Sequence, residues 1–467
     1  MATFINRAEE LAAIEKAYRR SGAQFLVLYG RRRVGKTTLI QAFLKGRRTI
    51  YFVADKQAEP ELRRRFQAAL AAALEDPRLE RLEFSSWDDL FSYWLEHENF
   101  SRKVVLVLDE FQYLAHVNPA FPSILQRLWD ERLRHKNLLL ILCGSLIHMM
   151  YSTTLGYQSP LYGRRTGQMR VEPIPFAYYK EFFPDLSPEK RLEFFAVTGG
   201  VPRYIELFHP RKSLWTNIDQ TILSKNGYLS AEPIFILSQE ISEPIHYVSI
   251  LKAIAEGERK IGNIASRLGL KTTTLTKYLD VLINLGLLER EVPVTEANPQ
   301  KSKLGLYSLK DDFFRFWFRY VLPHRSFLEM DQRAFVLSKI RKDFPTFTGP
   351  AYEAVCRAAM PRLARTKNLP FIPDRVGRWW TRSSDIDIVA FKESTREILF
   401  AECKWTDRPV DLSTLRDLQA KTLLVPWHLS DRKPYYAIFC KKRVSPGLKA
   451  LARKKQVILI TGVPELA

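Results

Sequence analysis

The sequence predicts an α/β protein built from several domains. Its 467 residues are enough for about three domains that each bury a core of their own. Short apolar runs at 25–29, 49–53, 104–108 and 138–143 alternate with helical patterns, which is typical of a parallel sheet covered by helices. Beyond residue 240 the pattern changes to three short helices with a wing, and then to a second set of strands and helices. These observations predict a parallel α/β core followed by further domains.

The first apolar run ends in a glycine loop that reads GRRRVGKT from Gly30 to Thr37. It matches G-x-x-x-x-G-K-[ST], in which backbone N–H groups surround phosphate oxygens and the following helix adds its partial positive charge. Lys36 is expected to reach the β- and γ-phosphates, and Thr37 to offer its hydroxyl to Mg²⁺. The sequence therefore predicts a nucleotide site formed by Gly30, Arg31, Arg32, Arg33, Val34, Gly35, Lys36, Thr37 and Thr38.

An acidic pair ends the third apolar run, in the segment VVLVLDEFQYL. Burying two carboxylates at the end of a strand costs free energy unless a cation lies beside them. The glycine loop upstream predicts such a cation, because bound phosphates are expected to bring Mg²⁺. Asp109 is expected to hold Mg²⁺, directly or through water, and Glu110 to polarise the water that attacks the γ-phosphate. A glutamate in this place favours an ATP-hydrolysing protein over a small GTPase.

Two further residues are candidates for contact with the γ-phosphate. Ser145 follows the fourth apolar run and is expected beside the end of the acidic strand, where it would sense phosphate or position water. An ordinary turn serine is the alternative. Arg164 and Arg165 follow a Ser/Thr/Gly-rich loop, and an arginine there would stabilise phosphoryl charge from the same chain or from a neighbour. A surface base without such a contact is the alternative.

A winged helix-turn-helix is predicted from residue 245 to residue 307. Thr272 is expected to cap its third helix, with wing strands at 287–293 and 304–309. The exposed face of that helix would carry Thr273, Thr274, Thr276 and Lys277. Because this face is only weakly basic, docking on protein stays open beside DNA recognition.

The next segment, DDFFRFWFRYVL, combines aromatic residues with arginines. Phe313, Phe316, Trp317 and Tyr320 follow helical spacing, which favours a buried structural helix over a base-stacking platform. Pro323 is expected to end this helix, and a domain boundary is expected at 348–350, which reads Thr-Gly-Pro.

A second acidic constellation lies near the C-terminus. Asp387 is on one predicted strand, and Glu402 and Lys404 share one face of the next. Two carboxylates and an ammonium group around one point are suited to hold Mg²⁺ and to orient a phosphodiester or its nucleophile. Glu353, on the preceding predicted helix, would complete this site. A related fold that binds nucleic acid without cutting it is the alternative.

The motifs FINRAEEL, LYGRRRVGKTTLI, VLVLDEFQYL, LILCGS, SPLYGRR and TGGVPRYIE, in this order, resemble archaeal-type ATPases of the STAND group, relatives of the AAA+ ATPases. The C-terminal constellation resembles the PD-(D/E)XK core of restriction-endonuclease-like domains. The resemblance implies that the segment from Phe4 to Arg7 lies near the adenine, and that a helical lid bearing Arg203 closes over the nucleotide. It implies a P-loop ATPase core at 1–160, the lid at 161–240, the winged helix at 241–310, a helical connector at 311–347 and a nuclease-like α/β domain at 348–467.

The charge balance indicates a polyanionic partner. With 72 Lys+Arg against 51 Asp+Glu, the formal net charge is +21, which favours nucleic acid, with DNA expected before RNA, or an anionic membrane surface. A solvated basic surface is the alternative. Four scattered cysteines and the lack of a signal-peptide pattern or a long apolar span predict a soluble cytoplasmic protein with reduced thiols and no membrane contact. The sequence thus predicts an ATP- and Mg²⁺-dependent switch on nucleic acid, with a nuclease activity in its C-terminal domain. The alternative is a regulatory ATPase that works through protein contacts or self-association, with an inactive nuclease-like module.

Overall fold

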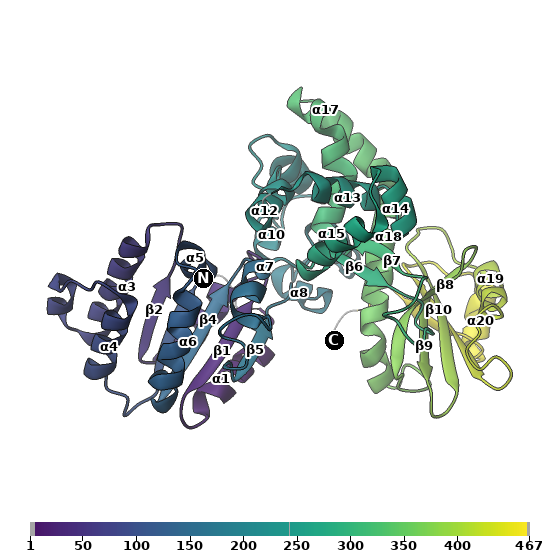
Figure 1. Ribbon diagram of the computed structural model, residues 1–467. Helices are drawn as coiled ribbons and strands as arrows, with labels where there is room; N and C mark the ends of the chain where they lie inside the picture. The colour runs from purple at the N-terminus through teal and green to yellow at the C-terminus, as the bar shows by residue number, and fades with distance from the viewer. Residues whose placement is uncertain (1–4, 242, 465–467) are drawn as a thin grey trace. The chain divides into compact units, whose positions relative to one another are not determined.

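A computed structural model describes residues 5–241 and 243–464 of the chain. The chain forms two compact units (Figure 1). The first unit contains Met1–Pro173 together with Gln239–Ser242, and the second contains Ile174–Ser238 and Glu243–Ala467. Within the described residues, no helix is both long and apolar enough to cross a membrane.

The first unit is built on a five-stranded sheet in the order β2-β3-β4-β1-β5, with every neighbouring pair parallel. All residues of β1, β3 and β4 are buried, as their unbroken apolar runs predict. The parallel α/β core is therefore confirmed. The short edge strand β5 has no apolar signal, because its residues are polar or half-buried, and it was not predicted. The strands are β1 (Gln24–Tyr29), β2 (Thr49–Val53), β3 (Val104–Asp109), β4 (Leu138–Gly144) and β5 (Gly167–Arg170).

Helices pack on this sheet and close its core. The core contains Ile14 of the first helix and Leu39 and Ile40 of the second, against Val107 and Ile141 of the sheet. The helices of this unit are α1 (Ala8–Arg19), α2 (Lys36–Leu44), α3 (Glu59–Leu74), α4 (Trp87–His97), α5 (Gln112–Val117), α6 (Phe121–Glu131) and α7 (Ile147–Met150). Short 3-10 turns cover Pro77–Arg81 and Leu133–His135, and a π-turn covers Tyr151–Leu155.

The second unit begins with the helices predicted as a lid. They are α8 (Tyr179–Phe182), α9 (Pro188–Thr198), α10 (Pro202–Glu206), α11 (Leu214–Ile218) and α12 (Glu232–Glu240), with a 3-10 turn at Phe176–Tyr178 and a π-turn at Asp219–Leu223. The segment is helical, as expected. The last two residues of α12 belong to the first unit. Closure of these helices over a nucleotide remains a prediction.

The winged helix is present where it was predicted. It consists of α13 (Ile245–Ala255), α14 (Ile261–Leu268), α15 (Thr272–Asn284) and the antiparallel strands β6 (Leu288–Glu291) and β7 (Leu306–Leu309). The predicted cap is wrong by one position: Lys271 precedes the helix in extended conformation and makes no side-chain cap, and Thr272 is already helical. The four residues expected on the outer face of α15 are all exposed.

The aromatic segment is structural, as predicted. Phe313, Phe316, Trp317 and Tyr320 are all buried. They lie on α16 (Asp312–Phe316) and on the π-turn Trp317–Val321 that continues it. Pro323 does not end the helical path. It occupies the 3-10 turn Leu322–His324, where its missing N–H costs nothing, and α17 (Arg325–Glu329) follows directly.

Helix α18 corrects the predicted boundary at 348–350. It runs unbroken from Arg333 to Arg365, with Pro345, Pro350 and Pro361 inside it. A buried stripe at helical spacing passes through the prolines and includes Ile340, Phe344, Phe347, Ala351, Val355 and Ala359. The packing of this stripe outweighs the loss of single backbone hydrogen bonds at the prolines.

The C-terminal sheet has the order β12-β11-β10-β9-β8. Strands β8 to β10 are antiparallel, whereas β10, β11 and β12 are parallel. Helix α18 lies along one side of the sheet, and α19 and α20 lie on the other (Figure 1). The elements are β8 (Arg375–Trp380), β9 (Asp385–Lys392), β10 (Glu397–Lys404), α19 (Leu412–Thr422), β11 (Lys433–Cys440), α20 (Pro446–Arg453) and β12 (Ile458–Thr461).

Candidate nucleotide site and C-terminal acidic cluster

The glycine loop is shaped by two positions that only glycine suits. Gly30 has φ +157°, and a Cβ there would lie 2.4 Å from the carbonyl oxygen of Val171. Gly35 has φ +91° and immediately precedes α2. Because L side chains rarely adopt these conformations, the loop needs both glycines to curl at the helix N-terminus.

Lys36 points back into the loop. Its Nζ donates to the carbonyl oxygens of Gly30, at 2.8 Å, and Arg31, at 3.0 Å. The side chain is buried, and burial lowers the pKa of Lys36, although Cys143, Glu110 and Asp109 act in the opposite direction. Phosphate oxygens would be stronger acceptors for this ammonium group than two neutral carbonyls.

The predicted Mg²⁺ ligands Thr37 and Asp109 meet. Thr37 Oγ1 donates to Asp109 Oδ2 at 3.2 Å, and the hydroxyl of Tyr51 donates to the same oxygen at 2.6 Å. Burial and the charge of Asp109 raise the pKa of Tyr51, so the phenol stays a donor. A hydroxyl and a carboxylate beside a phosphate loop fit Mg²⁺, which prefers oxygen ligands and substrate phosphates. Tyr51 lies on β2 and belongs to no motif, so it was not predicted.

Glu110 is held in a defined direction. Its backbone has φ +53°, and its N–H donates to Asp109 Oδ1 at 2.9 Å. Ser145 Oγ donates to Glu110 Oε2 at 2.7 Å, and Gln112 Nε2 donates to the same oxygen. The structure thus brings together Glu110 and Ser145, as expected, and adds Gln112. A positive φ at a non-glycine residue is a strain that is often found at functional sites.

Glu240 is a neighbour of the glycine loop that the sequence did not reveal. It is the last residue of α12, and its carboxyl accepts a hydrogen bond from the backbone N–H of Ile147. The Oε2 atom is buried and has no hydrogen-bond partner among the described residues. Burial raises the pKa of Glu240 to about 7, while Arg31, Arg32 and Lys36 act to lower it. Glu240 lies 130 residues after Glu110 in an ordinary helical segment, so no motif marks it.

Of the two N-terminal residues expected near the adenine, Phe4 and Arg7, the structure describes only Arg7. Phe4 lies outside the described residues. Arg7 is buried, and its Nη2 donates to the carbonyl oxygens of Val34, at 2.9 Å, and Glu172, at 2.8 Å. In this structure Arg7 therefore supports the backbone of the glycine loop, and its contact with adenine remains a prediction. Arg32 also makes a local contact, donating to the hydroxyl of Tyr113 at 2.6 Å.

The two arginines expected near the phosphates are engaged elsewhere. Arg164 forms an ion pair with Asp130 of α6, with Nε 2.9 Å and Nη2 2.9 Å from Oδ2. Arg203, on α10, lies 3.7 Å from Glu206 and over the ring of Tyr228. The expected contacts of Arg164 and Arg203 with a nucleotide remain predictions.

In the C-terminal sheet, Asp387 and Glu402 lie on the neighbouring strands β9 and β10, and both are buried. Asp387 Oδ2 accepts the backbone N–H of Cys403 at 2.8 Å, and Glu402 Oε1 accepts Lys404 Nζ at 2.7 Å. Burial, with the charges of Glu353 and Glu402, raises the pKa of Asp387 to about 7. Burial alone would lower the pKa of Lys404, but its hydrogen bond to Glu402 outweighs this and raises it. Lys421 of α19, which was not predicted, lies 3.3 Å from Glu402.

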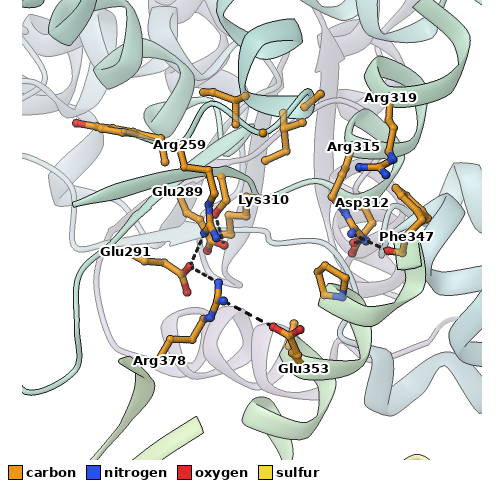
Figure 2. Close-up of a pocket in the computed structure, with 18 of the residues that line it drawn as sticks. Arg259, Glu289, Glu291, Lys310, Asp312, Arg315, Arg319, Phe347, Glu353 and Arg378 are labelled. Atoms are coloured by element: carbon orange, nitrogen blue, oxygen red, sulfur yellow. Dashed lines mark hydrogen bonds and ion pairs between the residues drawn. The ribbon is translucent and has the colours of Figure 1, made fainter. Parts of the chain in front are cut away.

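Glu353 is drawn towards an arginine instead of completing a metal site. Figure 2 shows it facing Arg378, with Glu353 Oε2 3.9 Å from Nη2 of the arginine. Across residues 5–241 and 243–464, no three His, Cys, Asp or Glu side chains are grouped closely enough to hold one metal ion. Asp387 and Glu402 have the chemistry for Mg²⁺, but Glu353 would have to leave Arg378 to join them.

Three protein-family models match parts of the chain. Residues 4–208 match an ATPase domain found predominantly in Archaea, residues 247–292 match the IclR helix-turn-helix domain, and residues 317–419 match archaeal and bacterial proteins of unknown function. The first two matches confirm the predicted ATPase and helix-turn-helix. The third does not show a PD-(D/E)XK domain.

Several relatives are similar to parts or nearly all of the chain. An uncharacterised protein of Methanocaldococcus jannaschii is 35% identical over 441 residues, which cover 94% of this chain and 96% of that protein. An uncharacterised ATP-binding protein of the same organism is 49% identical over 45 residues, or 10% of this chain and 76% of that protein. The solved Walker-type ATPase of Pyrococcus abyssi, at 21% identity, has a TM-score of 0.53 over 68% of this chain and 96% of its own, which shows a shared fold.

Similarity to the longer of the two Methanocaldococcus proteins extends over almost the whole chain, and the ATPase domain covers the glycine loop and acidic pair. The chain therefore belongs to the family of archaeal P-loop ATPases that includes this protein.

Proposed function

We propose that this protein is an ATP-hydrolysing switch of the STAND type that acts on DNA through its winged helix. One observation carries the proposal: Glu110 is aimed by Ser145 and Gln112 from directly beside the Thr37–Asp109 pair. A glutamate held in this way, beside the residues suited to bind Mg²⁺ and phosphate, fits a residue that orients the attacking water.

The residues of the glycine loop and of the neighbouring strand ends would each have a separate role in hydrolysis. Lys36 would exchange the carbonyls of Gly30 and Arg31 for phosphate oxygens, and the loop N–H groups would bind the remaining phosphate charge. Mg²⁺ held by Thr37 and Asp109 would neutralise charge on the phosphates. Glu110 would accept a proton from the attacking water, and Ser145 would keep its carboxylate in place during the transfer.

The winged helix is the part suited to contact DNA. Thr273, Thr274, Thr276 and Lys277 are exposed on α15, and small polar residues followed by a lysine suit a helix that enters the major groove. The net charge of +21 supplies the general attraction to phosphate. ATP binding and hydrolysis would then change how the chain holds DNA.

The decisive experiment is ATP turnover by Glu110→Gln, with and without DNA. The variant should bind ATP as the wild type does and lose turnover by roughly a hundredfold or more. Glu131→Gln, which makes the same change on the exposed end of α6, is the matched control. Equal turnover by Glu110→Gln and wild type would remove the proposed role. A steep fall in DNA affinity with added salt would support phosphate contacts.

A second candidate function, DNA cleavage, is favoured by the C-terminal cluster. Asp387 and Glu402 lie on adjacent antiparallel strands, and Lys404 donates a hydrogen bond to Glu402. This arrangement supports the PD-(D/E)XK resemblance. Mg²⁺ held there would activate water and stabilise phosphodiester charge. Asp387 and Glu402 would hold the ion, and Lys404 would orient the phosphate.

Cleavage is tested on branched, single-stranded and double-stranded DNA with Mg²⁺ or Mn²⁺. Glu402→Ala should abolish cutting, and Asp417→Ala, an exposed carboxylate on α19, should leave it unchanged. Cutting by Glu402→Ala would exclude this site as its source. A wild type that cuts none of these substrates would favour the alternative of a regulatory ATPase that works through protein contacts, with an inactive nuclease-like module.

A further inference from the structure

A charged pocket lies within the second unit and shares no residue with the glycine loop. It has a volume of about 340 Å³ and is lined by the winged helix, α16 and α18 (Figure 2). This volume is within the range of about 300–1,000 Å³ that is usual for small-ligand sites. Its lining includes six Lys and Arg side chains and four Asp and Glu side chains, so cations are in excess. The pocket is therefore suited to an anion.

Three of these arginines share a single carboxylate. Glu291, at the end of wing strand β6, has Arg259 Nη2 at 3.4 Å, Arg357 Nη2 at 3.6 Å and Arg378 Nη1 at 3.7 Å. Charge-assisted hydrogen bonds are ordinarily about 2.7–2.9 Å long. None of the three guanidinium groups is therefore tightly paired with Glu291.

The same arginines have further donor capacity. Arg357 Nη1 and Arg378 Nε are buried and have no hydrogen-bond partner among the described residues. Arg378 also lies 3.9 Å from Glu353 and 3.6 Å from Asp385, again beyond close pairing. Burial and the nearby charge of Arg378 lower the pKa of Arg259. Burial also acts to lower the pKa of Arg378, but the charges of Glu353 and Glu291 outweigh it and raise that pKa. Buried donors of this kind call for an additional acceptor.

Phosphate is the acceptor that suits them best. A guanidinium group presents its N–H donors in a planar fork that matches two phosphate oxygens. Arg357, on α18, and Arg378, on β8, approach Glu291 from different elements, so an anion between them would be bound from two directions. The side chains of Tyr307, Phe347 and Pro350 also line the pocket and give it an apolar wall suited to a sugar or base.

We propose that this pocket is a second phosphate-binding site, in which Arg357 and Arg378 hold the phosphate of a nucleotide or of a nucleic-acid end. Glu291 occupies the centre of this cluster as a weak internal substitute for the ligand. Because Glu291 belongs to the wing, phosphate binding would free it and alter the wing directly. The proposal goes beyond ATP hydrolysis, since no residue of the glycine loop takes part in it.

The test is calorimetric titration of the full chain with inorganic pyrophosphate. All variants carry Lys36→Ala, so that the glycine loop does not take up the probe. Arg357→Ala and Arg378→Ala should each weaken binding by about tenfold or more. Arg325→Ala, which removes an exposed arginine on α17, is the matched control and should bind as the parent does. Absence of pyrophosphate binding, or unchanged binding by Arg357→Ala, would overturn the proposal.

Glu291→Gln gives a test in the opposite direction that does not depend on an arginine variant folding well. If Glu291 is a substitute for phosphate, removal of its charge should tighten pyrophosphate binding, whereas a purely structural ion cluster would be loosened and would bind no better. Unchanged or weaker binding would count against the proposal.

Short DNA with a 5′-phosphate, compared with the same DNA bearing a 5′-hydroxyl, then identifies the source of the bound phosphate. A preference for the phosphorylated end indicates nucleic acid, and its lack, with pyrophosphate still bound, indicates a free nucleotide. Because the glycine loop is disabled throughout, failure here leaves the ATPase proposal standing.

Discussion

Ser145 Oγ donates a 2.7 Å hydrogen bond to Glu110 Oε2, joining the ends of two adjacent parallel strands. Ser145 is fully buried, so water does not compete for this bond. The pair explains why a serine after β4 matters to a glutamate after β3: the carboxyl ends of neighbouring parallel strands meet at one edge of the sheet.

Ser145→Ala should therefore slow hydrolysis while leaving ATP binding intact. A hydrogen bond to a charged group is worth about 1.5–3 kcal/mol, which corresponds to a loss of roughly 10- to 100-fold in kcat. Single-turnover hydrolysis and a separate ATP-binding titration measure the two effects. Ser123→Ala, at an exposed position on α6, is the control. Full activity in Ser145→Ala would mean that Gln112 alone positions Glu110.

Tyr51→Phe should raise the Mg²⁺ concentration needed for hydrolysis. The phenol donates a 2.6 Å hydrogen bond to Asp109 Oδ2 and keeps that carboxylate facing Thr37. Loss of such a supporting bond commonly weakens metal affinity by about 10- to 100-fold. ATP turnover measured against Mg²⁺ concentration gives the half-saturating value for each protein. The maximal rate should recover at high Mg²⁺, and a rate that stays low would assign Tyr51 a different task.

Glu240→Gln should strengthen ATP binding and remove part of its pH dependence. The raised pKa of Glu240, about 7, means that folding favours its neutral form, and added phosphate charge would favour that form further. ATP binding by the wild type should therefore take up a proton and weaken as pH rises above about 7, by up to about tenfold per pH unit.

Fluorescence titration with an ATP analogue at about pH 6 and about pH 8 measures this effect. Glu243→Gln, an exposed glutamate three residues later, is the control and should keep the dependence of the wild type. Parallel pH profiles for wild type and Glu240→Gln would mean that the carboxylate moves away when ATP binds.

Asp387→Asn should stabilise the chain at alkaline pH. Burial and the charges of Glu353 and Glu402 raise the pKa of Asp387, so the folded state holds its proton more strongly than the unfolded state does. A group with a raised acid pKa stabilises the fold while it is protonated, and this contribution is lost as pH rises towards about 7. The variant should unfold at a higher temperature than the wild type at about pH 8 and show a smaller difference at about pH 5. An equal or lower unfolding temperature at the higher pH would show that the ionised carboxylate is satisfied by its partners.

The parts that sequence predicted well are those in which neighbours in the chain are neighbours in space. The loop from Gly30 to Thr37 is one turn of backbone at a helix start, and Asp109 and Glu110 simply follow a buried strand. The contact between Ser145 and Glu110 could be predicted, because adjacent parallel strands end at the same edge of the sheet. The winged helix was predicted for a similar reason, from helical spacing and short connections.

The rest depends on contacts that no local pattern contains. Glu240 reaches the glycine loop from a helix far along the chain, and Arg378 reaches Glu291 from another sheet. Thr-Gly-Pro at 348–350 favours a break by its own propensities, yet the buried stripe of α18 continues through it. Glu353 was expected to complete the metal site with Asp387 and Glu402, but it lies 3.9 Å from Arg378, an arginine that no motif marks.

The unbroken α18 has a mechanical consequence. Its 33 residues form one helix of about 50 Å that continues through residues 348–350, so no loop separates its two ends there. Arg357 and Glu353 lie along the same helix, as does the stripe that packs under the aromatic segment. The aromatic segment and the C-terminal strands therefore pack on the same helix, so that a displacement of this helix would act on both.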